Sequence, residues 1–351
     1  MQARNRRLPL SVLRRPRPRR SKTFFRFPLP PVYIASVKAA VLHGKEDVRI
    51  EEIATPALQP GEVRLRIEAA LTCGTDAKCY RRGHPVLLGP APAPFGHEYA
   101  GVVIACGDDA PFSEGDLVCG VNSAPCGECA PCAAGREELC TDLYPLLNGA
   151  YAQMLKVPAR IARVNLHRVP EGVSAEVAAA IEPLACAVHG ADDAEARPGQ
   201  RIAILGRGPL GRLLALACEA RGAIPELLSR GEGAPSSYET VIEAAGTPEA
   251  WVHAIGLAAP GGAVVLFGGL PRETVVPVDS YRLHYEALTL RGSFHHRPRD
   301  VRAALGLLER AASSIARLLT HEFALADVVE PLRRGAGLAP RDGLLKAVIR
   351  P

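Results

Sequence analysis

Long apolar segments are missing from this sequence of 351 residues. No run reaches the roughly 18 apolar residues that a membrane helix needs, so a membrane-spanning protein is excluded. The first residues also lack the apolar core, about 7–15 residues long, of a secretory signal. With 48% hydrophobic and 23% charged residues, the composition is that of an ordinary globular protein and excludes disorder as the global state.

Acidic residues are absent from residues 1–36, which hold nine arginines and Lys22. Removing these ten positive charges from the net charge of +5 leaves −5 for residues 37–351. An acidic body argues against nucleic acid as a partner. We interpret residues 1–36 as a disordered, proline- and arginine-rich extension from an over-long gene model, ahead of a body that begins near Val37. A genuine basic tail and an organellar presequence are the alternatives.

The rest of the chain is long enough for two domains and contains no visible internal repeat. Up to about Asn165, short alternating runs are separated by prolines and glycines and predict a β-rich unit. Beyond it, Ser174 can cap a helix that reaches roughly Asp192, and buried-type strands alternate with helices. The expected strands are 37–44, 47–54, 61–73, 98–107, 115–121, 201–205, 224–229, 241–246, 263–269 and 344–351, and further helices are expected after the turn at 206–211 and at 248–259 and 301–314.

The ten cysteines do not have the spacing of a disulfide framework. Four of them fall within fifteen residues, at Cys126, Cys129, Cys132 and Cys140. Thiolates at such spacing can surround one Zn²⁺ and leave no open position, which predicts a structural zinc site. A loop of free thiols is the alternative. We therefore expect a reducing cytoplasm as the compartment.

A second set of donors predicts an open metal site. Cys73 ends one strand and His97-Glu98 begins another, while Glu182 lies on the helix that Ser174 caps. One thiolate, one imidazole and one carboxylate leave a position for water or substrate, as catalytic zinc requires. A His satisfied by an ordinary partner and a Glu182 paired with a neighbouring cation are the alternatives.

The segments GEVRLRIEAALTCGTDAKCY, FGHEYAGVV, the four-cysteine loop, IEPLACAVHG and the glycine turn together resemble the zinc-dependent medium-chain alcohol dehydrogenases, most closely their polyol (sorbitol-like) and threonine dehydrogenase branch. The resemblance implies an α/β fold in which a GroES-like β-barrel domain, residues 37–165 and again 299–351, holds an inserted Rossmann domain, residues 166–298. It implies that Cys73 and His97 bind the catalytic zinc, completed by Glu98 or, ranked second, Glu182. Two zinc ions per chain and a homo-oligomer, dimer or tetramer, are expected.

The run Gly206, Arg207, Gly208, Pro209, Leu210 and Gly211 follows a strand and opens a helix. This context favours a dinucleotide-binding turn, with the pyrophosphate at the helix N-terminus, over a plain strand-to-helix turn. The acidic residue typical of NAD-binding proteins is missing after the second strand, where Ser229 and Arg230 stand instead. A guanidinium suits a 2′-phosphate, so NADP is favoured over NAD.

Only eighteen residues, Ala223 to Thr240, separate the first Rossmann helix from the strand at 241–246. Relatives fit a further strand and two helices there, so the resemblance predicts a shortened Rossmann domain with a shallow adenine pocket.

The resemblance also suggests how the proton leaves. Thr75 takes the place of the Ser or Thr that shuttles a proton, and Lys78 stands where the relay often has a His. Water can replace Lys78, and Thr75 can be a mere turn cap.

Lys346 is expected either at the pyrophosphate or exposed on its strand. His295 and His296 replace the Arg-Tyr of polyol-type members, which puts a sugar alcohol in doubt; solvated loop residues are the alternative.

The leading hypothesis is thus a zinc-dependent NAD(P) dehydrogenase acting on a small polar secondary alcohol or polyol, with no membrane or nucleic-acid partner. The competing hypothesis is a non-catalytic, cofactor-poor descendant of the same fold that acts as a binding or scaffold protein.

Overall fold

A computed structural model describes residues 36–83, 90–144 and 146–351. The chain divides after Ile34, and everything below concerns the unit Ala35–Pro351. The prediction for residues 1–36 lies, apart from Ser36, outside the described residues. None of the described helices is long and apolar enough to cross a membrane.

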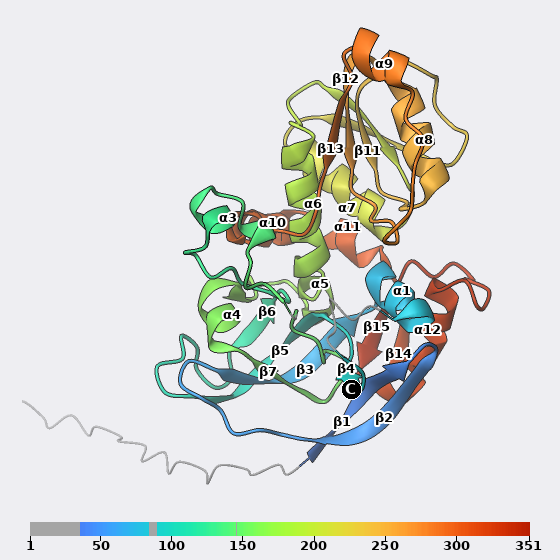
Figure 1. Ribbon diagram of the computed structural model, residues 1–351. Coiled ribbons are helices and arrows are strands. Elements are labelled where there is room, and N and C mark those ends of the chain that lie inside the picture. Colours follow the sequence, from blue (N-terminus) through green and yellow to red (C-terminus); the bar gives the residue numbers. More distant parts are fainter. Residues whose placement is uncertain (1–35, 84–89, 145) are drawn as a thin grey trace, which may run out of the picture. The chain divides into compact units, whose positions relative to one another are not determined.

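The first part of the chain, joined by the C-terminal strands, forms two largely antiparallel sheets (Figure 1). A small sheet has the order β2-β1-β4, and its strands are β1 Ser36–Gly44, β2 Asp47–Ala54 and β4 Ala93–Pro94. The larger sheet has the order β14-β15-β3-β5-β6-β8, with β7 beside β3. Its strands are β3 Val63–Leu71, β5 Glu98–Cys106, β6 Leu117–Gly120, β7 Met154–Val157, β8 Leu166–Arg168, β14 Leu319–Ala324 and β15 Lys346–Arg350. In β3, buried Val63, Leu65 and Ile67 alternate with more exposed residues, so the strand keeps one apolar face.

The C-terminal strands return to this sheet. In β15, Val348 lies opposite Leu71 of β3 in an antiparallel pair, and β14 pairs with β15 in parallel. This return places Lys346 beside the strand that leads to Cys73. The predicted domain limits at residues 165 and 298 remain a proposal.

A second sheet is wholly parallel and has the order β10-β9-β11-β12-β13. Its strands are β9 Arg201–Leu205, β10 Ile224–Leu228, β11 Tyr238–Glu243, β12 Ala258–Leu266 and β13 Thr289–Gly292. A complete dinucleotide-binding sheet has six strands in the order 3-2-1-4-5-6. The strand that would lie outside β10 is missing here, so the prediction of a shortened Rossmann domain is confirmed.

Helices flank both sheets. They are α1 Gly74–Arg82, α3 Ala130–Ala133, α4 Ala159–Val164, α5 Ala175–Ala178, α6 Ile181–Asp193, α7 Pro209–Glu219, α8 Pro248–Leu257, α9 Ser280–Tyr285, α10 Pro298–Arg310, α11 Ala312–Ala316 and α12 Val329–Gly335, with 3-10 turns at Glu137–Leu139 and Leu325–Asp327. Helix α6 packs against α7 and α10 (Figure 1). The apolar side chains of these helices share one core with the parallel sheet.

The single helix expected from Ser174 to Asp192 is wrong in one respect. Ser174 does cap a helix, since its side chain accepts from the Val177 N–H at 3.4 Å, but that helix is the four-residue α5. A new helix, α6, begins at Ile181. Pro183 explains the break, because it has no N–H to donate to Ala179 and is tolerated only in a first helical turn. The break puts Glu182 into the first turn of α6.

Candidate active site

One large cleft, with a volume of about 1150 Å³, takes its lining from both the antiparallel and the parallel sheet. Its walls include the start of α1, the start of β5, the first turn of α6, the glycine turn after β9 and the first residue of β15. The residues of the predicted open metal site and of the predicted cofactor turn therefore face the same space.

Cys73 is fixed by the helix that follows it. It is the N-cap of α1, and its sulfur accepts from the Thr75 N–H at 3.4 Å. In return, the Cys73 N–H donates to Oδ2 of Asp76 at 3.0 Å. This reciprocal cap orients the sulfur toward the cleft and leaves it able to bind a metal.

Asp76 holds the His97 ring through Nδ1, the nitrogen that would not bind the metal. Its Nδ1 lies 2.9 Å from Oδ1 of Asp76, and the other carboxylate oxygen of Asp76, Oδ2, accepts from the Tyr151 hydroxyl at 2.5 Å. Burial lowers the pKa of His97, but Asp76 and Cys73 outweigh it and raise that pKa well above its usual value. Gly96, with φ +87°, lets the chain pass the Tyr151 ring, which an added Cβ would meet at 2.7 Å. With Nδ1 on a carboxylate, Nε2 is the nitrogen presented to a metal.

Glu98 is fully buried and paired with Lys346. The Lys346 Nζ lies 2.8 Å from Oε1 and 2.6 Å from Oε2 of Glu98, and it also donates to the Thr72 carbonyl at 2.9 Å. Burial raises the pKa of Glu98, and Lys346 only partly opposes this. Lys346 is 3% exposed, so its interpretation as an exposed lysine is wrong. Its ammonium contacts Glu98, because the C-terminal strand enters the sheet next to Thr72, and its expected place at a pyrophosphate stays a prediction.

The donor atoms of Cys73, His97 and Glu98 all lie within 4.8 Å of one another. Thiolate, imidazole and carboxylate are ligands that zinc accepts, and the bond from Asp76 supplies the support typical of a metal-binding His. The residues present therefore fit a zinc ion. Glu182 belongs to a different group, with His295 and His296, whose donor atoms also lie within 4.8 Å of one another.

The four-cysteine loop forms its own cluster. The sulfurs of Cys126, Cys129, Cys132 and Cys140 lie within 4.8 Å of one another, and all ten cysteines of the chain are free thiols. The Thr141 and Cys132 N–H groups lower the pKa of Cys129 to about 6. Four sulfurs with N–H donors to stabilise thiolates fit a closed zinc site.

The glycine turn has the geometry that its sequence predicts. Gly206 has φ +135°, and a Cβ on Gly211 would lie 1.8 Å from the Gly206 carbonyl oxygen, so only glycine fits there. Helix α7 begins at Pro209 with Gly208 as its N-cap, and all six residues 206–211 line the cleft. The free N–H groups at the start of α7 face a position where an anion can bind.

The comparisons with known proteins agree with this geometry. Residues 59–171 match the model of the alcohol dehydrogenase GroES-like domain. A sorbitol dehydrogenase of Bacillus subtilis is 26% identical over 90% of this chain and 98% of its own length. A sorbitol dehydrogenase of Bombyx mori is 36% identical, but that match covers 54% of this chain and 56% of the relative.

A solved structure extends the likeness to the whole unit. A putative zinc-binding dehydrogenase from Sinorhizobium meliloti, bound to NADP, has a TM-score of 0.80 at 25% identity and covers 90% of this chain and 99% of its own. The matched domain, the relatives and this structure together support the zinc-dependent medium-chain alcohol dehydrogenase family for this chain. It is accordingly an oxidoreductase of the NAD(P)-dependent alcohol dehydrogenase type.

The residues that follow β10 in this dehydrogenase do not lie where the sequence predicts contacts with the cofactor. Ser229 and Arg230 are not among the described residues that line the cleft. Glu232, which sequence reasoning missed, accepts from the Ser229 N–H at 2.9 Å and pairs with Arg207 at 2.8 Å. Arg207 also donates to the Leu227 carbonyl at 3.2 Å. An acidic side chain thus lies four residues beyond the strand, although Glu232, like Ser229 and Arg230, is not among the described residues that line the cleft.

Thr75 and Lys78 both line the cleft, on the first turns of α1. Burial, with help from Arg82, lowers the pKa of Lys78, and its Nζ lies 3.4 Å from the Gly269 carbonyl. Glu243, another residue that sequence reasoning missed, ends β11 and accepts from the Gly246 N–H at 2.7 Å and the Gly268 N–H at 3.2 Å. It thereby fixes the loop that faces Lys78.

His295 and His296 are 8% and 3% exposed, so their interpretation as solvated loop residues is wrong. Burial and the neighbouring His189 lower the pKa of His295 to about 3, and burial lowers the pKa of His296 further below its usual value. Burial thus favours the neutral form of both imidazoles.

Asp76 and Tyr151 were not identified from the sequence. A signal for Asp76 exists, because an acidic residue three positions after a helix cap completes a capping box. No local signal points to Tyr151, which reaches Asp76 from 75 residues away.

Proposed function

We propose that this enzyme transfers a hydride between a polar secondary alcohol or polyol and a nicotinamide dinucleotide, with a zinc ion held by Cys73, His97 and Glu98. The observation that carries the proposal is the cleft itself. The three donors and the glycine turn 206–211 line one space, so a substrate beside the metal can meet the nicotinamide.

The chain's own residues have separate tasks in this reaction. Bound zinc would polarise the substrate oxygen and lower the pKa of an alcohol in the cleft. Asp76 holds His97 in the tautomer and orientation that a ligand needs, and Lys346 keeps Glu98 in place. The N-terminus of α7 holds the pyrophosphate.

Oxidation of the alcohol releases one hydride and one proton. A nicotinamide bound in the cleft would accept the hydride from the carbinol carbon, which would become a carbonyl. The hydroxyl proton passes to Thr75 and from there to Lys78 or water. The lowered pKa of Lys78 supports its place in this relay.

The cofactor that Glu232 favours is NAD(H). Its carboxylate can accept hydrogen bonds from ribose hydroxyls and repels a 2′-phosphate, and Arg207 is already paired with it. This replaces the preference for NADP that Ser229 and Arg230 suggest in the sequence.

Two zinc ions per chain, one in the cleft and one on the four cysteines, belong to the same proposal. The domain limits 37–165 with 299–351, and 166–298, a homo-oligomeric state and a cytoplasmic location are further parts of it. A non-catalytic descendant is not favoured, because the glycine turn retains the cavity and the close approaches that a dinucleotide needs.

Titration of the purified protein with NADH and NADPH, followed by nicotinamide fluorescence, tests the cofactor site. We expect enhancement, stronger with NADH, and its loss in Gly208→Trp, since a Cβ on Gly208 meets no atom within 4 Å and the indole would fill the cleft. Gly256 on α8 has the same open surroundings away from the cleft, so Gly256→Trp is the matched control.

A screen of secondary alcohols and polyols with both cofactors tests the reaction. Sorbitol, erythritol and threonine belong in it, because relatives are named for them. Turnover that disappears in Cys73→Ala supports the proposal. Silence with every substrate and no fluorescence change with either cofactor overturns it in favour of the non-catalytic hypothesis.

A further inference from the structure

Three buried side chains outside the proposed catalytic zinc set point at one another. Glu182 lies in the first turn of α6, and His295 and His296 follow β13. They are 6%, 8% and 3% exposed, and one donor atom of each lies within 4.8 Å of the others. The two histidine rings have centroids 4.0 Å apart.

His296 has no partner that would explain its burial. Neither Nδ1 nor Nε2 has a hydrogen bond to any described residue, although both atoms are fully enclosed. A neutral imidazole can satisfy one nitrogen with a donor and the other with an acceptor, so leaving both unpaired costs free energy. A cation between His296 and Glu182 would remove that cost on one side of the ring and neutralise the buried carboxylate.

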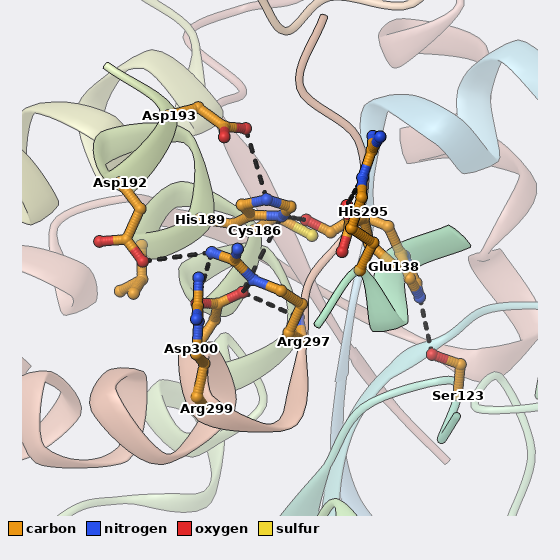
Figure 2. Close-up of polar contacts among 12 residues, drawn as sticks. Ser123, Glu138, Cys186, His189, Asp192, Asp193, His295, Arg297, Arg299 and Asp300 are labelled. Carbon is orange, nitrogen blue, oxygen red and sulfur yellow. Dashed lines mark hydrogen bonds and ion pairs between the residues drawn. The ribbon is translucent and has the colours of Figure 1, made fainter. Parts of the chain in front are cut away.

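The backbone is shaped to put both histidines on the same side. Consecutive side chains on an extended chain point in opposite directions, but His295 has φ +63°, which turns the chain between the two. The His189 Nδ1–H donates to the His295 carbonyl at 3.0 Å and holds this turn (Figure 2). A strained conformation held by such contacts is a feature of binding sites.

The His295 ring is oriented by a bond of its own. Its Nε2 shares a hydrogen bond of 2.7 Å with the Ser123 hydroxyl, as Figure 2 shows. That bond leaves Nδ1 as the nitrogen available to a cation, and it supplies the support that metal-binding histidines usually have.

We propose that Glu182, His295 and His296 bind a third divalent metal ion, separate from the ion at Cys73, His97 and Glu98. Two imidazoles and one carboxylate form a three-ligand set that zinc accepts and that leaves a coordination position open. Nitrogen donors favour Zn²⁺ or Co²⁺ over Mg²⁺ or Ca²⁺, which prefer oxygen. The site shares the cleft with the proposed catalytic set, since Glu182 and His295 also line it, and it rests on Glu98 rather than Glu182 completing the zinc of the proposed function.

Metal counting on the full-length protein tests this site. After removal of metals with a chelator and reloading with Zn²⁺, elemental analysis should give three ions per chain in the wild type and two in His296→Ala. The exposed His284 supplies the control, since His284→Ala should keep three. The same number of ions in the wild type and in His296→Ala overturns the proposal.

A second variant guards against loss of folding. Glu182→Gln keeps the shape of the side chain and removes its charge, so it should also lose one ion while circular dichroism stays unchanged. Failure of both variants to lose an ion overturns the third site.

Cobalt spectra separate this site from the catalytic one. In Co²⁺-loaded protein, the thiolate charge-transfer absorption from the Cys73 site should persist in Glu182→Gln, while the ligand-field bands lose the contribution of one ion. In Cys73→Ala, the thiolate charge-transfer absorption from the Cys73 site should be lost, while the ligand-field contribution of the third site persists. If Cys73→Ala loses no ion, the proposed catalytic site fails while the third site stands.

Discussion

The four-cysteine loop and the cleft cluster are two proposed metal sites built in opposite ways. The loop takes four identical ligands from fifteen consecutive residues, around two short helical segments, α3 and Glu137–Leu139. The cleft takes three different ligands from the ends of β3 and β4 and the start of β5. Its ligands rest on buried partners, Asp76 and Lys346, whereas the loop sulfurs rest on backbone N–H groups. A closed site can therefore be built from local sequence, whereas an open site depends on the tertiary fold.

The largest effect should come from the cleft ligand itself. Cys73→Ala should lower kcat/KM by about a thousandfold or more, because several kcal/mol of charge stabilisation are lost. Its unfolding midpoint should stay close to that of the wild type, as Cys73 is only partly buried. Steady-state rates and thermal unfolding check this. Activity within tenfold of the wild type would break the comparison.

The ion pairs of the two regions should differ sharply. Lys346→Ala leaves Glu98 buried without its counterion and should lower the free energy of unfolding of metal-free protein by about 3–5 kcal/mol. On the loop, Arg136 is 64% exposed beside Glu138 at 3.5 Å, and Arg136→Ala should cost less than about 1 kcal/mol. Urea unfolding of both variants measures the difference. Equal losses would show that the cleft pair is not desolvated.

Asp76 should affect the zinc affinity of the cleft site but not that of the four-cysteine loop. Asp76→Asn removes the carboxylate behind His97 and should weaken zinc binding in the cleft about 10–100-fold. Competition with a chromophoric chelator measures the two classes of zinc separately. Unchanged affinity in the cleft would mean that His97 is not a ligand through Nε2.

The smallest effect should come from a substitution near the proposed cofactor site. Glu232→Gln frees Arg207 and removes the charge that repels a 2′-phosphate, so it should improve NADPH binding relative to NADH by about tenfold, or about 1.4 kcal/mol. Fluorescence titration checks the ratio, with exposed Glu239→Gln as a control. A preference for NADPH already in the wild type would return the role to Ser229 and Arg230.

Local patterns predicted most of the fold. The alternation in β3 and the strand-glycine turn-helix order at 201–219 rest on neighbours in sequence, whereas the interpretation of the short stretch 223–240 rests on the family resemblance. The structure agrees with each. The α5–α6 break was missed because Pro183 acts on a carbonyl four residues earlier, within an otherwise continuous helical pattern.

The site was predicted less completely, because several of its contacts join residues that lie far apart in sequence. The ligand types of Cys73 and His97 are visible in the sequence, but the ion pair of Lys346 and Glu98 spans 248 residues. The burial of His296 depends on contacts with Glu182 in another element, and no periodicity contains it. What the sequence lacks is the information on which distant side chains share a buried space.

Anomalous diffraction at the zinc edge, from crystals grown with NAD(H), tests the central claim most directly. The account predicts a peak in the cleft, bonded to Cys73 Sγ, His97 Nε2 and Glu98, with the nicotinamide in the same cleft. A cleft without a peak beside Cys73 and His97, in protein that keeps zinc on its four-cysteine loop, would contradict it.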